Sequence, residues 1–284
     1  MNVYEVITAR ILESLQQGVV PWRKPWSSDL PRNLVSGREY RGVNVLLLQS
    51  ASFTSPYWMT YRQAEALGGT VKRGERGCPI VFWKISPRDE VEGTTGKGFV
   101  LRYFTVFNAT QTEGVAVPAP PERGAFDPNA ECERVVAAYS SPPEIQHGGG
   151  RACYMPMLDR IQLPEKEQFS SPAEYYSTLF HELAHSTGAE HRLARKGIVN
   201  GAAYSNHSYA FEELVAECGS AFLAAHAGIS PATLDNSAAY IASWAKRLRG
   251  EPRWIVEAAS QAAKAVDLIL GKVAHAAASE EVAA

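Results

Sequence analysis

The sequence has few cysteines and no long hydrophobic run, and each shortage excludes a class of protein. Its four cysteines form no Cys-x-x-Cys pair, which argues against a thiolate zinc site and against a disulfide framework. No stretch is long and apolar enough to cross a membrane. The N-terminal segment is amphipathic and contains Glu5, Arg10 and Glu13, unlike the apolar core of a signal peptide. We therefore expect a protein of the reducing cytoplasm that has no membrane partner.

Charge is distributed unevenly, although the formal net charge is only -2. Residues 1–110 contain 14 Lys and Arg against 9 Asp and Glu, a balance of +5, and the remainder contains 14 against 21, a balance of -7. A basic first half indicates a polyanionic partner. A length of 284 residues favours two domains, and the glycines and prolines of residues 112–130 predict a linker between them. The expected domains are residues 1–111 and 131–284.

The first domain is expected to combine helices with a β-hairpin. An amphipathic pattern predicts a helix over residues 3–16, and Thr60 with Gln63 at capping-box spacing predicts a second helix that ends at Gly68. Residues 78–85 and 99–107 are rich in β-branched and aromatic side chains, and a polar connection joins them. These two segments predict an antiparallel hairpin.

The second domain is expected to be mostly helical with a small sheet, so the whole chain is assigned to the α+β class. Ser171, Pro172 and Glu174 are a cap, a first-turn proline and a capping glutamate, and they predict a helix that Gly188 can close in the left-handed conformation. Residues 154–163 predict a strand whose proline suits a sheet edge, where an extended peptide could pair. Further helices are predicted over residues 209–227, 235–249 and 252–270.

The predicted helix contains the pattern His181-Glu182-Leu183-Ala184-His185. Histidines at positions i and i+4 lie side by side, so both imidazoles can bind one tetrahedral metal at roughly 2.0 Å. Glu182 then lies beside the open coordination position, where a carboxylate can accept the proton of water and deliver it to a leaving group. The pattern indicates a metallohydrolase with one divalent cation. Zinc is the expected ion, and Mn²⁺ or another divalent cation is the alternative.

A third ligand is needed, and the sequence offers two sources. The spacing His-Glu-x-x-His-x-x-Gly-x-x-His would make His191 a ligand, but that pattern requires a downstream methionine and all four methionines lie upstream. The alternative is the acidic segment 211–217, in which Glu213 is the favoured ligand and Glu217 the favoured partner of a ligating histidine. The reverse assignment stays open. Tyr204 and His207 are candidates for stabilising an oxyanion.

Cations and aromatic residues alternate through residues 20–110. Single-stranded nucleic acid fits this mixture, because its bases stack on aromatic rings for roughly 1 to 3 kcal/mol each while Lys and Arg contact the phosphates. Strand aromatics such as Phe82, Phe104 and Phe107 are expected in the core, whereas the tryptophans of residues 21–26 have little core to join. The candidate DNA contacts are Trp22, Arg23, Lys24, Trp26, Arg41, Lys72, Arg73 and Lys84.

Several segments resemble the ArdC-type antirestriction proteins of conjugative plasmids, and the first half also resembles the N-terminal domain of TraC-like plasmid primases. The similar segments are residues 18–26, 40–44, 72–77, 81–84, 106–108, 159–161, 181–188, 192–193 and 213–217. The resemblance implies an N-terminal domain that binds single-stranded DNA, a zincin-like metallopeptidase domain and protection of incoming plasmid DNA from host restriction. In that family pattern position 191 is not a fixed histidine.

The leading hypothesis is a cytoplasmic antirestriction protein that binds single-stranded DNA and carries a metallopeptidase centre, with an unidentified protein or peptide substrate. One alternative is a regulatory or toxin-like intracellular metalloprotease whose basic half recruits protein substrates. The other alternative is a DNA-binding module whose metal site is not catalytic.

Overall fold

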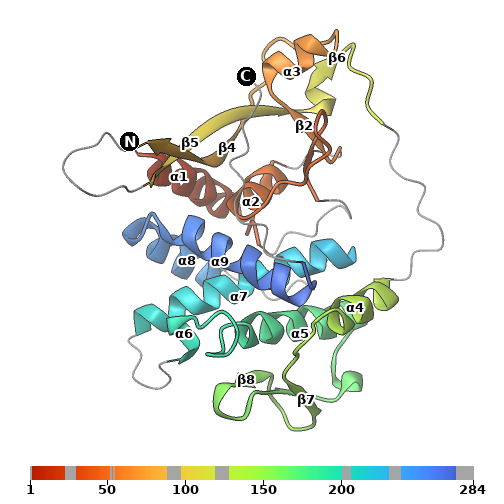
Figure 1. Cartoon of the computed structure of the whole chain (residues 1–284), viewed down its shortest axis with the longest axis vertical. Coiled ribbons are helices and arrows are strands. Elements are labelled where there is room, and N and C mark those ends of the chain that lie inside the picture. The colour runs from red at the N-terminus through yellow and green to blue at the C-terminus, as the bar shows by residue number, and fades with distance from the viewer. Residues whose placement is uncertain are drawn as a thin grey trace.

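The first half of the chain forms two small sheets with three helices (Figure 1). This computed structural model describes residues 2–22, 30–51, 53, 55–87, 97–118, 128–199, 206–229 and 238–272. A four-stranded sheet has the order β1-β2-β5-β4, and a two-stranded sheet pairs β3 with β6. The strands are β1 (Arg32–Asn33), β2 (Tyr57–Met59), β3 (Thr70–Val71), β4 (Cys78–Pro87), β5 (Lys97–Asn108) and β6 (Thr112–Glu113). The helices are α1 (Val3–Gln16), α2 (Val43–Ser50) and α3 (Tyr61–Ala66).

The hairpin predicted for this half is confirmed. Strands β4 and β5 pair antiparallel, from Cys78 opposite Val106 to Pro87 opposite Lys97. The helix predicted from its amphipathic pattern and the helix predicted from its capping box are confirmed as well, as α1 and α3, and a reciprocal capping box begins each of them. Helix α2 was not predicted. Six of its eight residues, from Val43 to Leu48, are buried, so it has no polar face and its sequence lacks helical periodicity.

The second half is mostly helical and includes a three-stranded sheet of order β7-β9-β8, as the α+β assignment predicted. The strands are β7 (Glu144–His147), β8 (Cys153–Met155) and β9 (Arg160–Leu163). The helices are α4 (Pro128–Ala137), α5 (Pro172–Ser186), α6 (Lys196–Val199), α7 (Asn206–Ala227), α8 (Ala238–Gly250) and α9 (Trp254–Ile269). Among the described residues, no helix combines the length and the apolar character that crossing a bilayer requires.

Two sequence expectations need correction at their boundaries. The single strand expected over residues 154–163 is a hairpin: Pro156 begins a 3-10 turn after β8, and Asp159 has a φ of 45° before β9 begins. The expected linker, residues 112–130, is too long at both ends. Residues 112–113 form strand β6, which pairs with β3, and helix α4 begins at Pro128. Residues 119–127 lie outside the described part of the chain, and the division into two domains stays a prediction.

The largest buried cluster is continuous across the two halves. It combines Ile7 and Leu15 of α1 with Leu214 of α7 and Ile255 of α9. In Figure 1, α1 and α2 lie against α8 and α9, while α5 and the small sheet lie on the far side of α7. A second cluster packs α5 against α4, α7 and β9. Helix α7, which carries the acidic segment of the candidate site, therefore contributes residues to both clusters.

Candidate metal centre

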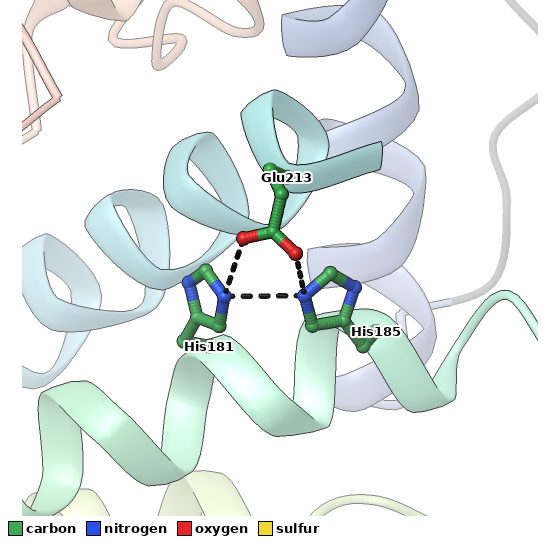
Figure 2. A group of neighbouring side chains, drawn as sticks. All are labelled: His181, His185 and Glu213. Carbon is green, nitrogen blue, oxygen red and sulfur yellow. Dashed lines mark hydrogen bonds and ion pairs between the residues drawn. The ribbon is translucent and has the colours of Figure 1, made fainter. Parts of the chain in front are cut away.

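Helix α5 brings the two pattern histidines together. The helix begins where the Ser171 side chain accepts the backbone N–H of Glu174, at 3.2 Å, and its apolar face, including Phe180 and Leu183, is buried in the second cluster. His181 and His185 lie one turn apart on the opposite side, with their Nε2 atoms 3.1 Å from each other (Figure 2). Two imidazole nitrogens that face one another so closely are suited to share a cation.

Helix α7 supplies the carboxylate that completes the group. Glu213 Oε2 lies 3.5 Å from His181 Nε2, and Glu213 Oε1 lies 3.5 Å from His185 Nε2 (Figure 2). The ligand atoms of these three residues all lie within 4.8 Å of one another. Ligand atoms about 2.0 to 2.1 Å from a tetrahedral zinc are about 3.3 Å apart. The group therefore fits one divalent cation and leaves a fourth position open.

Glu212 contacts the outer ring nitrogen of His185. Its Oε1 lies 3.3 Å from His185 Nδ1, and the Glu212 side chain is only 4% exposed. A carboxylate on Nδ1 fixes the ring so that Nε2 faces the metal position. At His185, Glu212 therefore takes the role that the sequence reasoning gave to Glu217. Residues 212 and 213 are neighbours on α7, so one presents its carboxylate to His185 Nδ1 and the other to the two Nε2 atoms.

Hydrogen bonds in this group shift the pKa of His185 and of its acidic partners in opposite directions. Burial disfavours a charged imidazole, but hydrogen bonds to Glu212 and Glu213 outweigh burial and raise the pKa of His185 to about 10. Burial also acts to raise the pKa of Glu213, but its contacts with His181 and His185 hold that pKa far below the usual range. Without a cation, His185 is therefore protonated at neutral pH.

Glu182 lies against the edge strand of the small sheet. Its Oε2 accepts the backbone N–H of Tyr154 in β8, at 2.7 Å, and the side chain is buried. This bond holds one carboxylate oxygen of Glu182 at the strand and orients the side chain between the metal helix and β8. The sequence indicated the strand and the glutamate separately but not the bond between them.

Tyr209 is a site residue that the sequence reasoning missed. It precedes Glu213 by one turn of α7, and although 64% of the residue is exposed, partial burial of its hydroxyl and the contact with the Glu213 carboxylate raise the pKa of that hydroxyl to about 12. The i, i+4 spacing was the available signal. His207, suggested for an oxyanion, instead lies 3.0 Å from Glu251 and packs on Trp254. Tyr204 lies outside the described residues.

The alternative ligands are not part of the group. His191 is exposed, and its Nε2 lies 3.5 Å from Asp159 Oδ2. Glu217 lies one turn beyond Glu213 and does not belong to the three-residue group. Gly188 does not adopt the left-handed conformation expected of it. A Cβ at that position would lie 2.6 Å from Cγ1 of Ile198 and 3.0 Å from Nη2 of Arg195, so the glycine provides room for both side chains.

The candidate DNA contacts have varied surroundings. Trp22 is only 1% exposed and packs edge-on against Trp244, 5.8 Å away, so the expectation that this tryptophan lacks a core is wrong. Arg41 forms an ion pair with Asp267 of α9. Lys72 and Arg73 are exposed. The backbone of Arg23, Lys24 and Trp26 and the side chain of Lys84 lie outside the described part of the chain.

One aromatic assignment also changes. Phe104 was expected in the core, but 38% of it is exposed. Its ring lies 5.7 Å from that of Phe82, which packs against the large core cluster. Phe104 therefore covers the edge of the core and remains partly open to solvent.

Two sequence families match the chain. Residues 130–261 match the family described as zincin-like metallopeptidase, and residues 1–107 match the N-terminal domain of anti-restriction factor ArdC. Together with the helix pair and its His-His-Glu group, these matches define the class: a zincin-like metallopeptidase domain that follows a sheet-containing N-terminal domain.

Solved structures and curated relatives narrow the class to a family. The Mn(II)-bound structure of antirestriction protein ArdC from plasmid R388 is 38% identical, covers 97% of this chain and 99% of its own, and has a TM-score of 0.78. The metal-free structure of ArdC from R388 has a TM-score of 0.77 and covers 96% of this chain and 98% of its own. Protein y4eC of Sinorhizobium fredii is 36% identical and covers 94% of this chain and 91% of its own. The chain belongs to the ArdC family of antirestriction proteins.

A longer relative shares the same region. DNA primase TraC of Escherichia coli is 36% identical over 94% of this chain, but the chain spans only 27% of the primase. The similarity therefore covers both halves of this chain and a minor part of the primase.

Proposed function

We propose that this chain is a cytoplasmic antirestriction protein that binds single-stranded DNA through its first half and hydrolyses peptide bonds at the His181, His185 and Glu213 group. The observation that carries the peptidase proposal is the convergence of these three ligands, two of which lie on the helix that also carries the buried Glu182. The proposed biological role is protection of incoming plasmid DNA from host restriction.

His181, His185 and Glu213 would hold one divalent cation, with zinc expected and Mn²⁺ as the alternative. The ArdC protein of R388 has been crystallised with Mn(II), and two imidazoles with a carboxylate suit either ion. When bound, the cation supplies Lewis acidity, which polarises a carbonyl group and lowers the pKa of water toward roughly 7.

Glu182 is the proposed general base and acid. Its carboxylate accepts a proton as water attacks the peptide carbonyl carbon, and it returns the proton to the leaving amine as the C–N bond breaks. The Tyr154 N–H bond fixes one oxygen of Glu182 and leaves the other for this transfer. The Tyr209 hydroxyl, beside Glu213, is a proposed donor to the developing oxyanion.

The small sheet offers a place for the substrate backbone. Strand β8 is an edge strand in the order β7-β9-β8, and an extended peptide can pair with such an edge through backbone groups other than the Tyr154 N–H, which donates to Glu182. Met157 and Leu158 at the hairpin tip are 95% and 59% exposed. Apolar side chains of a bound peptide could pack against them.

Glu182→Gln tests the peptidase proposal. The metal-loaded protein and its variants are incubated with a mixed library of unstructured peptides, and new termini are identified by mass spectrometry. The wild type is expected to cleave a subset of peptides, Glu182→Gln to bind metal with cleavage reduced about 100-fold or more, and the exposed-surface control Glu190→Gln to cleave normally. A metal-loaded wild type that cleaves no library peptide overturns the peptidase proposal and favours a non-catalytic metal site.

An exposed aromatic row on β5 supports the proposed DNA contact. Tyr103 and Phe107 share one face of the strand because side chains alternate, and Tyr61 of α3 packs edge-on against Phe107 at 6.5 Å. Tyr103 is 55% exposed and Tyr61 is 48% exposed. The exposed Arg62 follows Tyr61 in the sequence, and the exposed Arg76 precedes Gly77, where a Cβ would lie 3.1 Å from Cε1 of Phe107. Bases could stack on the rings while these guanidinium groups contact phosphates.

Affinity for a fluorescent oligothymidine, measured by anisotropy, tests this surface. Tyr103→Ala is expected to lose about 1 to 3 kcal/mol, roughly 5- to 150-fold, whereas Leu67→Ala, an exposed apolar residue without a π-face, leaves affinity unchanged. Affinity should fall linearly on a log–log plot against salt. Equal effects of the two substitutions, or an affinity independent of salt, would exclude this surface.

A further inference from the structure

Two buried arginines follow the metal helix, three positions apart. The side chains of Arg192 and Arg195 are 4% and 6% exposed, although arginine is almost never buried unless paired. Each donates to backbone carbonyls of the last turn of α5 and also to one carboxylate from a different element. A buried guanidinium with several fixed acceptors is a rigid connection, because its planar fork allows few alternative geometries.

Arg195 connects the metal helix to α7. Its Nη2 donates to Glu212 Oε1 at 2.6 Å and to the carbonyl of Ala184 at 2.7 Å. Its Nε donates to Glu212 Oε2 at 3.0 Å, and its Nη1 donates to Thr187 Oγ1 at 2.6 Å. Glu212 in turn lies against Nδ1 of His185. The contacts therefore lead from Arg195 through one carboxylate to a metal-ligand imidazole.

Arg192 connects the metal helix to the β8-β9 hairpin. Its Nη1 donates to Asp159 Oδ1 at 2.6 Å and to the carbonyl of Ser186 at 3.0 Å, and its Nη2 donates to Asp159 Oδ2 at 2.8 Å. Asp159 Oδ1 also accepts the hydroxyl of Tyr154 at 2.8 Å. The backbone N–H of the same tyrosine donates to Glu182 Oε2. These contacts lead to the proposed general base and do not include a metal ligand.

We propose that Arg192 and Arg195 are positioning residues with separate tasks. Arg195 orients His185 for the metal through Glu212, and Arg192 holds β8, and with it Glu182, through Asp159 and Tyr154. This inference rests on the proposed function only for the role of Glu182. Arg195 is one of two side chains that crowd Gly188, because a Cβ there would lie 3.0 Å from its Nη2 and 2.6 Å from Cγ1 of Ile198.

Metal affinity is the first measurement, made by calorimetry with Zn²⁺ and with Mn²⁺ on the full chain. Arg195→Lys keeps the positive charge but loses the paired contact with Glu212. It is expected to lower the affinity for each of the two metals about 10- to 100-fold. Arg192→Lys should change either affinity less than about threefold. Circular dichroism of each variant confirms that the helices are retained.

Hydrogen exchange of the Tyr154 amide is the second measurement, made on the metal-free protein. Arg192→Lys and Asp159→Asn are expected to speed this exchange at least about threefold, because they release the hairpin from α5. Arg195→Lys should leave the exchange of Tyr154 unchanged. Asp159→Asn has nearly the same shape as the native residue, so it provides a second variant if Arg192→Lys fails to fold.

Metal affinity and exchange of the Tyr154 amide together test whether the two arginines have separate tasks. If both lysine variants weaken metal binding equally, or if both accelerate hydrogen exchange of the Tyr154 amide equally, the two arginines stabilise the same structure and the proposal of separate tasks is wrong. The inference also fails if neither variant changes its assigned readout. Because neither readout requires catalysis, a chain without peptidase activity would refute the proposed function and leave this test intact.

Discussion

Glu213 faces both imidazoles of the metal helix, and Glu217 lies one turn beyond it on the same helix. Glu213→Gln removes an ionised ligand and leaves a weaker amide oxygen, so we expect it to lower Zn²⁺ affinity about 100-fold or more. Glu217→Gln is the matched control and should stay within about threefold of wild type. Calorimetric titration of the three proteins measures this, and a larger loss for the Glu217 variant would transfer the ligand assignment to that residue.

Proton release is a second prediction at the residue scale. The pKa of His185 is raised to about 10 in the metal-free protein, and a cation binds only the neutral imidazole. At pH 7.5, below this pKa, binding must displace the proton of His185, whereas Glu213, with its lowered pKa, is already ionised. We expect release of about one proton from His185 and an apparent affinity that rises with pH until roughly pH 10.

Titrations at pH 7.5 in buffers with different heats of ionisation measure this proton directly. The observed binding enthalpy should vary linearly with the buffer's ionisation heat, with a slope that corresponds to about one proton. A slope of zero would mean that His185 is neutral before the cation binds.

The α5-α7 pair brings the ligands together, and the two helices approach each other closely at Gly219. A Cβ at this position would lie 2.9 Å from the Cβ of Ala184. Gly219→Leu should force the helices apart, lower the free energy of unfolding by about 1 to 3 kcal/mol and weaken metal binding. Gly250→Ala, where no atom lies within 4 Å of the added Cβ, is the control. Urea unfolding and Zn²⁺ titration of both variants measure the effects. An unchanged metal affinity in Gly219→Leu would show that the distance between α5 and α7 at this position does not control the geometry of the ligands.

Elements with local signals could be predicted from the sequence, whereas elements defined by tertiary packing could not. The cap of Ser171 and the i, i+4 histidines identified α5 and its reactive face, because both depend on residues within one helix. Helix α2 gave no periodic signal because it is buried on most sides. The contact between Glu212 and His185 depends on how α7 is rotated against α5, which spacing within α7 does not reveal.

The whole molecule has one large core that both halves share. Trp22 of the first half packs on Trp244 of the second, and α7 separates this core from the second cluster around α5. From the sequence, Trp22 was expected to have little core to join, because its partner Trp244 lies more than two hundred residues away along the chain. Long-range packing of this kind leaves no local pattern.

The shared core predicts a single cooperative unfolding transition. Zn²⁺ at about 100 times its dissociation constant should stabilise the protein by about 2.7 kcal/mol. Because unfolding is cooperative, amide exchange through global opening should slow in α1 as well as in α7. Differential scanning calorimetry and hydrogen exchange mass spectrometry measure this with and without metal. Two separate transitions, with protection confined to the second half, would contradict a shared folding unit.

The central claim is that His181, His185 and Glu213 bind one divalent cation. Anomalous diffraction from crystals grown with Mn²⁺ or Zn²⁺, recorded on both sides of the metal absorption edge, tests it directly. The claim predicts one strong anomalous peak about 2.0 to 2.2 Å from two imidazole Nε2 atoms and a carboxylate oxygen. A peak coordinated by His191 or Glu217 instead, or no peak between α5 and α7 in metal-loaded crystals, would contradict it.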